Sequence, residues 1–260
     1  MARAQTPTTA AVIVIGNEIL SGRTRDANLP FLARELAGLG ILLREARVVS
    51  DELDAIAEAV DACRRRYHHV FTTGGLGPTH DDVTAAAIAR AFGRRLLRHP
   101  EAEARLRAFY PPERLNPARL KMADLPEGAR LIDNPLSGAP GFSIENVHAL
   151  AGIPAIAQAM FASLRHRLEG GAPLQSRTLR AWAPEGDLAQ TLDALQRRWP
   201  DLQIGSYPTF QGERPAAHLV LRGTDPALLD RAARELASRL EELGVAVEEP
   251  HPPNPETAPS

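Results

Sequence analysis

The sequence has a single cysteine, no long apolar run and almost no net charge. Cys63 has no second cysteine with which to form a disulfide in the chain, and a metal site built from several cysteines is excluded. The 30 basic and 32 acidic side chains give a formal net charge of −2, so no overall field attracts nucleic acid or an anionic membrane. The apolar run 11–15 is far too short to cross a bilayer. We therefore expect a cytoplasmic protein whose partner is neither a nucleic acid nor a membrane.

Short apolar runs alternate with amphipathic segments in the first part of the chain. Buried strands are predicted at the runs 11–15, 41–49 and 68–73. Helices are predicted where apolar residues recur at helical spacing, at 28–40, 53–60 and 81–92. Ser50 or Asp51 is placed to cap the second helix, and Asp81 or Asp82 begins the third. This alternation predicts an α/β fold with a mostly parallel sheet covered on both faces, and such sheets bind ligands beyond the carboxyl ends of their strands.

A second domain is expected after residue 170. Residues 168–175 contain two glycines and a proline and are typical of a linker. The segments that follow are predicted as strand, helix, strand, strand and helix, which makes a small α+β module of βαββα order. The last residues are rich in proline and polar side chains. We therefore expect a first domain over 1–170, a small domain over 176–245 and a disordered tail over 246–260.

The stretch "TTGGLGPTHDDVT", Thr72–Thr84, places a glycine-rich turn between a strand and a helix. Such a turn exposes backbone N–H groups, and the following helix start adds more of them, which together form an anion site suited to phosphate. A Walker A loop would require Gly-Lys-Ser/Thr, and the chain has no such triplet. A Rossmann fingerprint would require a glycine three residues after Gly77, where His80 stands. The stretch therefore predicts a phosphate site of neither type.

Two adjacent carboxylates follow this turn and would repel a phosphate. A divalent cation resolves the conflict if Asp81 or Asp82 holds the metal and the metal holds the phosphate oxygens. The alternative is a capping box, in which Thr79 is the N-cap and Asp82 reaches back to it. Spacing alone leaves both interpretations open.

Other candidate residues depend on their expected position near the same edge of the sheet. Glu18, Asp26 and Asn28 lie in the loop after the first strand. Asp26 or Asn28 can instead cap the next helix. Lys121 is long enough to reach a phosphate, although a lone lysine is more often solvated.

Taken together, "IGNEILSGRTRDAN", "TGGLGPTHDDVT", "NPLSGAPGF" and "LAGIP" resemble the MoaB/Mog molybdopterin-binding fold. The branch they resemble most is that of the CinA N-terminal domain and the FAD synthase N-terminal domain, and the resemblance covers 11–168. It implies a three-layer α/β core with a pocket at the strand ends. It implies ligand-binding positions on the glycine loop and around it, at Thr73, Gly74, Gly75, Gly77, Pro78, Thr79, Thr84, Glu18, Asp26 and Asn28. It implies a second ligand loop at Ser137, Gly138, Pro140 and Gly141. Asp82 stands at the position of the family's functional aspartate.

The resemblance also bears on activity. MoaB/Mog proteins bind molybdopterin and adenylate it, whereas the CinA and FAD synthase branch is associated with metal-dependent hydrolysis of dinucleotides such as ADP-ribose or FAD. Asn17 stands where many CinA-like sequences have an aspartate. The small module resembles a KH-like domain but has no GxxG loop between two helices, so RNA binding is not carried over. No segment resembles the CinA amidohydrolase or the FAD synthase nucleotidyltransferase domain, so neither activity is expected.

Three hypotheses follow. The first is a pyrophosphohydrolase of dinucleotides in which Asp81 and Asp82 hold Mg²⁺, Mn²⁺ or Co²⁺, Asp82 serves catalysis, and Lys121 neutralises developing charge. The second is a protein that binds or adenylates molybdopterin, with the pterin phosphate on the same loop. The third is a binding protein that lacks catalytic activity. The resemblance also implies a homo-oligomer, either a dimer or a trimer.

Overall fold

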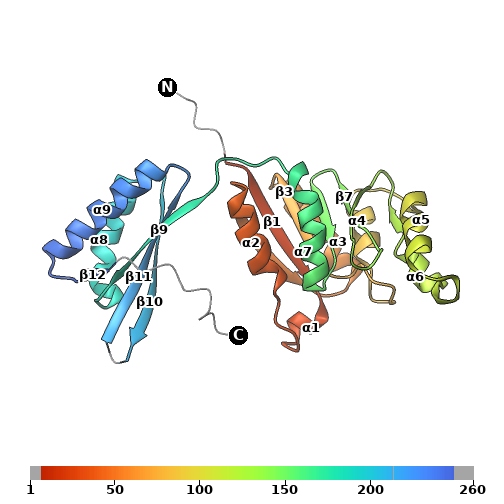
Figure 1. The fold of residues 1–260 in the computed structure, drawn as a ribbon, viewed down its shortest axis with the longest axis horizontal. Coiled ribbons are helices and arrows are strands. Elements are labelled where there is room, and N and C mark those ends of the chain that lie inside the picture. The colour runs from red at the N-terminus through yellow and green to blue at the C-terminus, as the bar shows by residue number, and fades with distance from the viewer. Residues whose placement is uncertain (1–6, 213, 249–260) are drawn as a thin grey trace, which may run out of the picture. The chain divides into compact units, whose positions relative to one another are not determined.

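The computed structural model describes residues 7–212 and 214–248, and the chain divides into two compact units at Gly171/Ala172 (Figure 1). The first unit contains β1 (Thr9–Ile15), α1 (Asn17–Leu20), α2 (Asn28–Gly38), β2 (Leu42–Val49), α3 (Leu53–Arg64), β3 (His69–Thr73), α4 (Thr84–Ala91), β4 (Leu96–Arg98), α5 (Pro100–Phe109), α6 (Pro117–Lys121), β5 (Asp124–Pro126), β6 (Arg130–Ile132), β7 (Gly141–Ile144), β8 (Val147–Leu150) and α7 (Pro154–Leu164). The second unit contains β9 (Gln175–Ala181), α8 (Glu185–Arg198), β10 (Gln203–Gln211), β11 (Arg214–Gly223), α9 (Pro226–Glu242) and β12 (Val247–Glu248). Short 3-10 turns lie at Pro112–Arg114 and Arg165–Arg167. None of these helices has the length and apolar character needed to pass through a bilayer.

The sheet of the first unit is mostly parallel, as predicted. Its strand order is β2-β1-β3-β8-β7-β6, in which β2, β1, β3 and β8 pair in parallel and β7 and β6 continue antiparallel. The pair β4 and β5 forms a separate two-stranded sheet. Because the parallel strands run in one direction, the loops after β1, β3 and β8 begin at the same edge.

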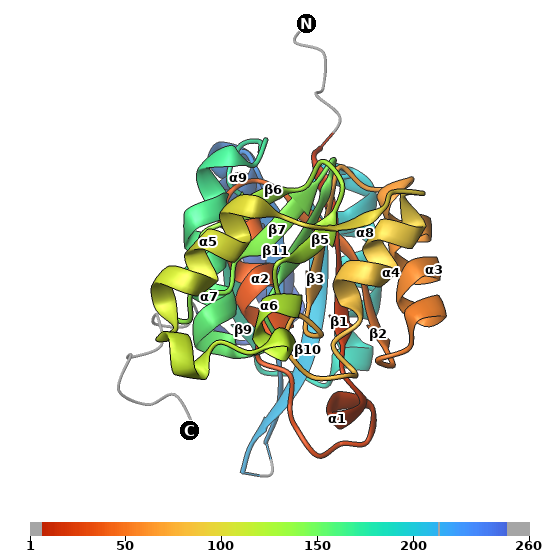
Figure 2. The ribbon, with the colours of Figure 1, turned by 90° about the vertical axis from the view of Figure 1, so that its right-hand side faces the viewer.

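Helices cover both faces of this sheet, which gives the predicted three layers. In β1, Ile13 and Ile15 pack into a core shared with α3 and α4, while Val12 and Val14 pack into a second core shared with α2 and α7. Successive side chains of a strand point to opposite faces, so a strand buried on both faces needs a continuous apolar run. Figure 2 shows α2 and α7 on one side of the sheet and α3 and α4 on the other.

The second unit is an antiparallel sheet with two helices on one face. The strand order is β10-β11-β9-β12, and Leu179, Leu219 and Leu221 pack against α8 and α9. The predicted βαββα order is confirmed, and a further short strand follows it. Val247 pairs with Ala181 of β9 and contacts the core, so the predicted tail boundary at 246 is too early. The rest of the predicted tail, 249–260, lies outside the described residues.

Candidate functional site

The glycine loop lies between two other loops at the carboxyl ends of the parallel strands. Gly74 N–H donates to Leu150 O at 3.2 Å, and a β-carbon on Gly152 would stand 3.2 Å from Gly74 Cα. Gly74 has φ +104°, and a side chain there would collide with the Ile15 carbonyl. Only glycine fits so close to two neighbouring chains at this backbone angle. The loop therefore presents its backbone on the edge where ligands bind in such folds.

Thr79 and the two aspartates form a hydrogen-bonded turn that follows the glycines. Asp82 Oδ2 accepts from Thr79 N–H at 2.8 Å and lies 2.5 Å from Thr79 Oγ1, and Asp81 Oδ1 lies 2.6 Å from the same hydroxyl. A β-carbon on Gly77 would be 2.5 Å from Asp82 Oδ2, so this glycine leaves room for the carboxylate. Since one hydroxyl hydrogen serves only one acceptor at a time, the two carboxylates retain free lone pairs.

The predicted start of the third helix at Asp81 or Asp82 is wrong. Helix α4 begins at Thr84, and its N-cap, Val83, makes no side-chain capping bond. The bond from Asp82 back to Thr79 does form, but within a turn that precedes the helix, so Thr79 is not its N-cap. Short acidic side chains often favour such turns because they bond to nearby backbone N–H groups.

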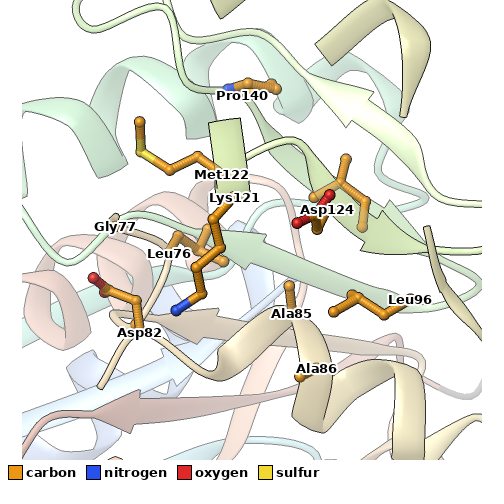
Figure 3. Close-up of a pocket in the computed structure, with 12 residues that line it drawn as sticks. Leu76, Gly77, Asp82, Ala85, Ala86, Leu96, Lys121, Met122, Asp124 and Pro140 are labelled. Carbon is orange, nitrogen blue, oxygen red and sulfur yellow. The ribbon is translucent and has the colours of Figure 1, made fainter. Parts of the chain in front are cut away.

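Lys121 brings a positive charge to this turn from a distant part of the sequence. Its ammonium, at the end of α6, donates to Thr79 O at 2.7 Å. It lines a pocket together with Gly75, Gly77 and Asp82, and Figure 3 shows Lys121 extending from α6 toward the side of the pocket that Asp82 occupies. The hydrogen bond from Thr79 holds the pKa of Asp81 below its ordinary value, with smaller contributions from its own backbone N–H, His80 and Lys121. Asp81 is therefore charged at neutral pH.

The acidic residues after β1 have different surroundings. The Glu18 carboxylate folds over Gly16, where a β-carbon would lie 2.5 Å from Oε1. The Asp26 carboxylate accepts from Asn28 N–H at 3.2 Å and Leu29 N–H at 2.8 Å, the first two residues of α2, although the N-cap position of this helix is Ala27. Glu18 is thus available at the strand end, while the oxygens of Asp26 are engaged.

Asp51 joins this edge in a way that the sequence did not indicate. It was predicted, with Ser50, to cap α3, but the N-cap of α3 is Glu52 and makes no side-chain bond. Asp51 Oδ2 instead accepts from Asn17 N–H at 2.7 Å. Asp51 is the second residue after β2, and its place at the end of a parallel strand next to β1 was the one available signal for this contact.

Three predicted ligand-binding residues are buried. Thr84 Oγ1 donates to Gly74 O at 2.9 Å, so its hydroxyl supports the loop from beneath. Asn28 donates to Gly152 O at 2.8 Å and fixes the third loop. Among the described residues, Asn28 Oδ1 and Thr73 Oγ1 have no hydrogen-bond partner. Pro78, by contrast, is exposed between Gly77 and Thr79.

The second predicted ligand loop is organised by Asn134, which the sequence analysis did not single out. Its amide donates to Ala139 O at 2.8 Å and to Ser137 Oγ at 2.5 Å, and its Oδ1 accepts from Leu136 N–H at 3.0 Å. An asparagine before proline commonly bonds to backbone two or three residues ahead, which was the signal for it. Gly138 has φ +71° and lies against the Phe109 ring. Pro140 lines the pocket of Figure 3, whereas Gly141 lies within β7.

The donors available for a divalent ion are two carboxylates and a hydroxyl. Within 7–212 and 214–248, no three His, Cys, Asp or Glu side chains gather as a metal-binding group. Asp81 and Asp82 nevertheless lie on one turn beside the glycine loop. Mg²⁺ typically binds one or two carboxylates and takes its remaining ligands from water and substrate phosphates. The turn fits an ion that arrives with a phosphorylated ligand, rather than one held by the protein alone.

The family model described as "Probable molybdopterin binding domain" matches residues 11–169, and that described as "FAD synthase, middle domain" matches 173–249. A protein of Aeropyrum pernix is 38% identical over 92% of this chain and 94% of its own length. A CinA-like protein of Gloeobacter violaceus is 37% identical over 89% of this chain, which spans 56% of that relative. The crystal structure of the protein CinA with unknown function from Thermoplasma acidophilum is 36% identical, with a TM-score of 0.59, and covers 62% of this chain and 98% of its own. The chain therefore belongs to the molybdopterin-binding domain family, in its CinA-like branch, and carries a second domain of the FAD synthase middle type.

Proposed function

We propose that this protein hydrolyses the pyrophosphate bond of dinucleotides such as ADP-ribose or FAD, with a divalent metal ion. The observation that carries the proposal is the convergence of Asp81, Asp82 and Lys121 on Thr79, at the end of the glycine loop. A pyrophosphate needs backbone donors, a cation near its oxygens and a metal to offset its charge. This edge of the sheet offers residues for each need.

The chain's own residues would divide the work as follows. The backbone N–H groups of Gly75–Gly77 would hold the pyrophosphate, because that of Gly74 already donates to Leu150 O. Lys121 would exchange the Thr79 carbonyl for a phosphoryl oxygen and neutralise charge that develops there. Asp81 and Asp82 would hold the divalent ion, which when bound polarises a phosphoryl oxygen and lowers the pKa of water.

The reaction balances with water as its only co-reactant. Water adds its oxygen to one phosphorus, the bridging P–O bond breaks, and the bridging oxygen leaves with the other phosphate. ADP-ribose would give AMP and ribose phosphate, and FAD would give AMP and FMN. The second domain supports FAD as a candidate, because it matches a domain described from FAD synthase.

The test is release of mononucleotides from ADP-ribose and from FAD by the full chain, with Mg²⁺, Mn²⁺ or Co²⁺ and with EDTA. Separation of the products by chromatography identifies the broken bond. Metal-dependent formation of AMP is expected. Absence of cleavage of both substrates with all three metals would reject the proposal.

A second candidate function is molybdopterin binding, which the family match over 11–169 favours. The glycine loop would then hold the pterin phosphate. Oxidation of the purified protein followed by fluorescence detection of released pterin tests this candidate. Pterin retained by the wild-type chain and lost in a Lys121→Met variant would favour it over hydrolysis.

A further inference from the structure

The sheet of the second unit has one face that neither of its helices covers. Helices α8 and α9 pack on the face that carries Leu219 and Leu221 (Figure 1). Side chains alternate along a strand, so His218, Val220 and Arg222 of β11 point to the opposite face. Tyr207 of β10 is 48% exposed. A large aromatic side chain is thus presented on a face that the helices of this unit leave open.

Arginine and aromatic side chains are paired across this face. The ladder sets Tyr207, His218 and Arg180 side by side on β10, β11 and β9. The Arg222 guanidinium donates to Tyr207 Oη at 3.3 Å and lies 5.9 Å from the ring centre. At the end of β9, Trp182 has the Arg214 guanidinium carbon 4.3 Å from its ring centre, and that of Arg180 at 5.7 Å. These are cation–π distances.

The charge on this face selects among possible occupants. Three arginines share it with one described carboxylate, Glu248, whose oxygen is 4.0 Å from Arg180. A second copy of the chain would bring one positive face against another, which is unfavourable. A sheet face is also flat and its side chains stand perpendicular to it, which suits an extended strand. The occupant should therefore be extended and anionic, with flat groups able to stack.

We propose that this face binds single-stranded nucleic acid, with a base stacked on Tyr207 and phosphates contacted by Arg180, Arg214 and Arg222. Single-stranded nucleic acids are bound by aromatic side chains that stack on bases and by positive side chains that follow the backbone, in several proteins on a sheet face. The site is distinct from the glycine loop and does not depend on the proposed hydrolysis.

The test is fluorescence anisotropy of a short labelled single-stranded RNA with the full chain, over a series of salt concentrations. A DNA strand of the same sequence and a duplex serve as competitors. Tyr207→Ala should weaken binding about fivefold or more, whereas Tyr207→Phe, which keeps the ring, should retain it. Arg222→Gln should lower the slope of log affinity against log salt by about one.

The matched control is Arg234→Gln, which removes an exposed arginine from α9 on the helical side of the unit. It should leave binding unchanged. Absence of RNA and DNA binding by the wild-type chain at low salt would overturn the proposal. An equal loss of RNA affinity in Arg234→Gln would also overturn it, as would tighter binding of the duplex than of the single strand. So would competition by polyglutamate that displaces the labelled RNA as effectively as unlabelled RNA does.

Discussion

The two candidate sites of this chain are built in opposite ways. The glycine loop is mostly local, because Gly74, Gly77, Thr79 and Asp82 follow one another within nine residues, while Lys121 and Pro140 reach its pocket from distant segments. The open sheet face is dispersed, because its aromatic and arginine side chains occupy alternate positions on three strands. The first site therefore depends on backbone shape and the second on the register of a sheet.

The first prediction concerns a series of hydrogen bonds in the first unit that runs from the surface at Glu169 to the buried His148. Glu169 O can only accept, so the neutral His69 donates to it through Nε2 and accepts through Nδ1 from His148 Nε2, at 3.3 Å. His148 Nδ1 then accepts from Ser143 Oγ at 2.9 Å. Burial lowers the pKa of His148 to about 3 and also lowers that of His69.

These buried histidines predict that acid destabilises the first unit more than the second. In the unfolded chain, His148 takes up a proton as the pH falls below ~6.5, whereas in the folded chain it stays neutral until the pH nears its lowered pKa. The free energy of unfolding is therefore highest above pH ~6.5 and decreases as the pH falls. The loss approaches about 4 kcal/mol by pH ~3. Both tryptophans, Trp182 and Trp199, lie in the second unit, so their fluorescence follows that unit while hydrogen exchange follows the first. Simultaneous acid unfolding of both units would contradict the prediction.

The second prediction concerns the charge at the glycine loop. Asp82→Asn keeps an oxygen to accept from Thr79 N–H but removes the negative charge. Turnover of ADP-ribose or FAD should fall about 100-fold or more, because the proposed metal ion would lose a charged ligand. Asp54→Asn, an exposed residue of α3 paired with Arg90, is the control and should retain activity. Comparable losses in both variants would remove Asp82 from the site.

The third prediction concerns the shape of the loop rather than its charge. Gly77→Ala would place a methyl group against Asp82 Oδ2, the end of a flexible side chain. The carboxylate should move, so turnover should fall about tenfold while the melting temperature changes little. A variant with full activity would show that Asp82 tolerates displacement and would weaken the geometric argument.

The fourth prediction tests the independence of the two regions and has the smallest effect. Arg222→Gln should reduce nucleic-acid binding about threefold at moderate salt and leave dinucleotide hydrolysis unchanged. Asp82→Asn should reduce dinucleotide hydrolysis and leave nucleic-acid binding unchanged. Parallel titrations of RNA and dinucleotide with each variant measure both effects, and a loss of both activities in either variant would mean that the sites are coupled.

The difference between the regions also determined what the sequence could reveal. Strands β1, β2 and β3, the three layers and the position of the glycine loop were predictable, because apolar periodicity and glycine clusters are local signals. The contact between Asp51 and Asn17 was not, because it joins residues 34 positions apart. The start of α4 was misplaced because the bond from Asp82 to Thr79 N–H closes a turn before the helix. The positive charge of the open sheet face was not predictable, because a net charge of −2 does not show where positive and negative side chains lie on the surface.

The central claim is that the Thr79 turn is a metal and pyrophosphate site. The most direct measurement is a crystal structure with Mn²⁺ and a non-hydrolysable methylene analogue of ADP-ribose, using the anomalous signal of manganese. The account predicts manganese bound directly to Asp81 or Asp82, with the analogue's phosphates on the Gly75–Gly77 backbone and Lys121 contacting one of their oxygens. An analogue bound on that loop with no manganese at either aspartate, or manganese and analogue both bound elsewhere, would contradict it.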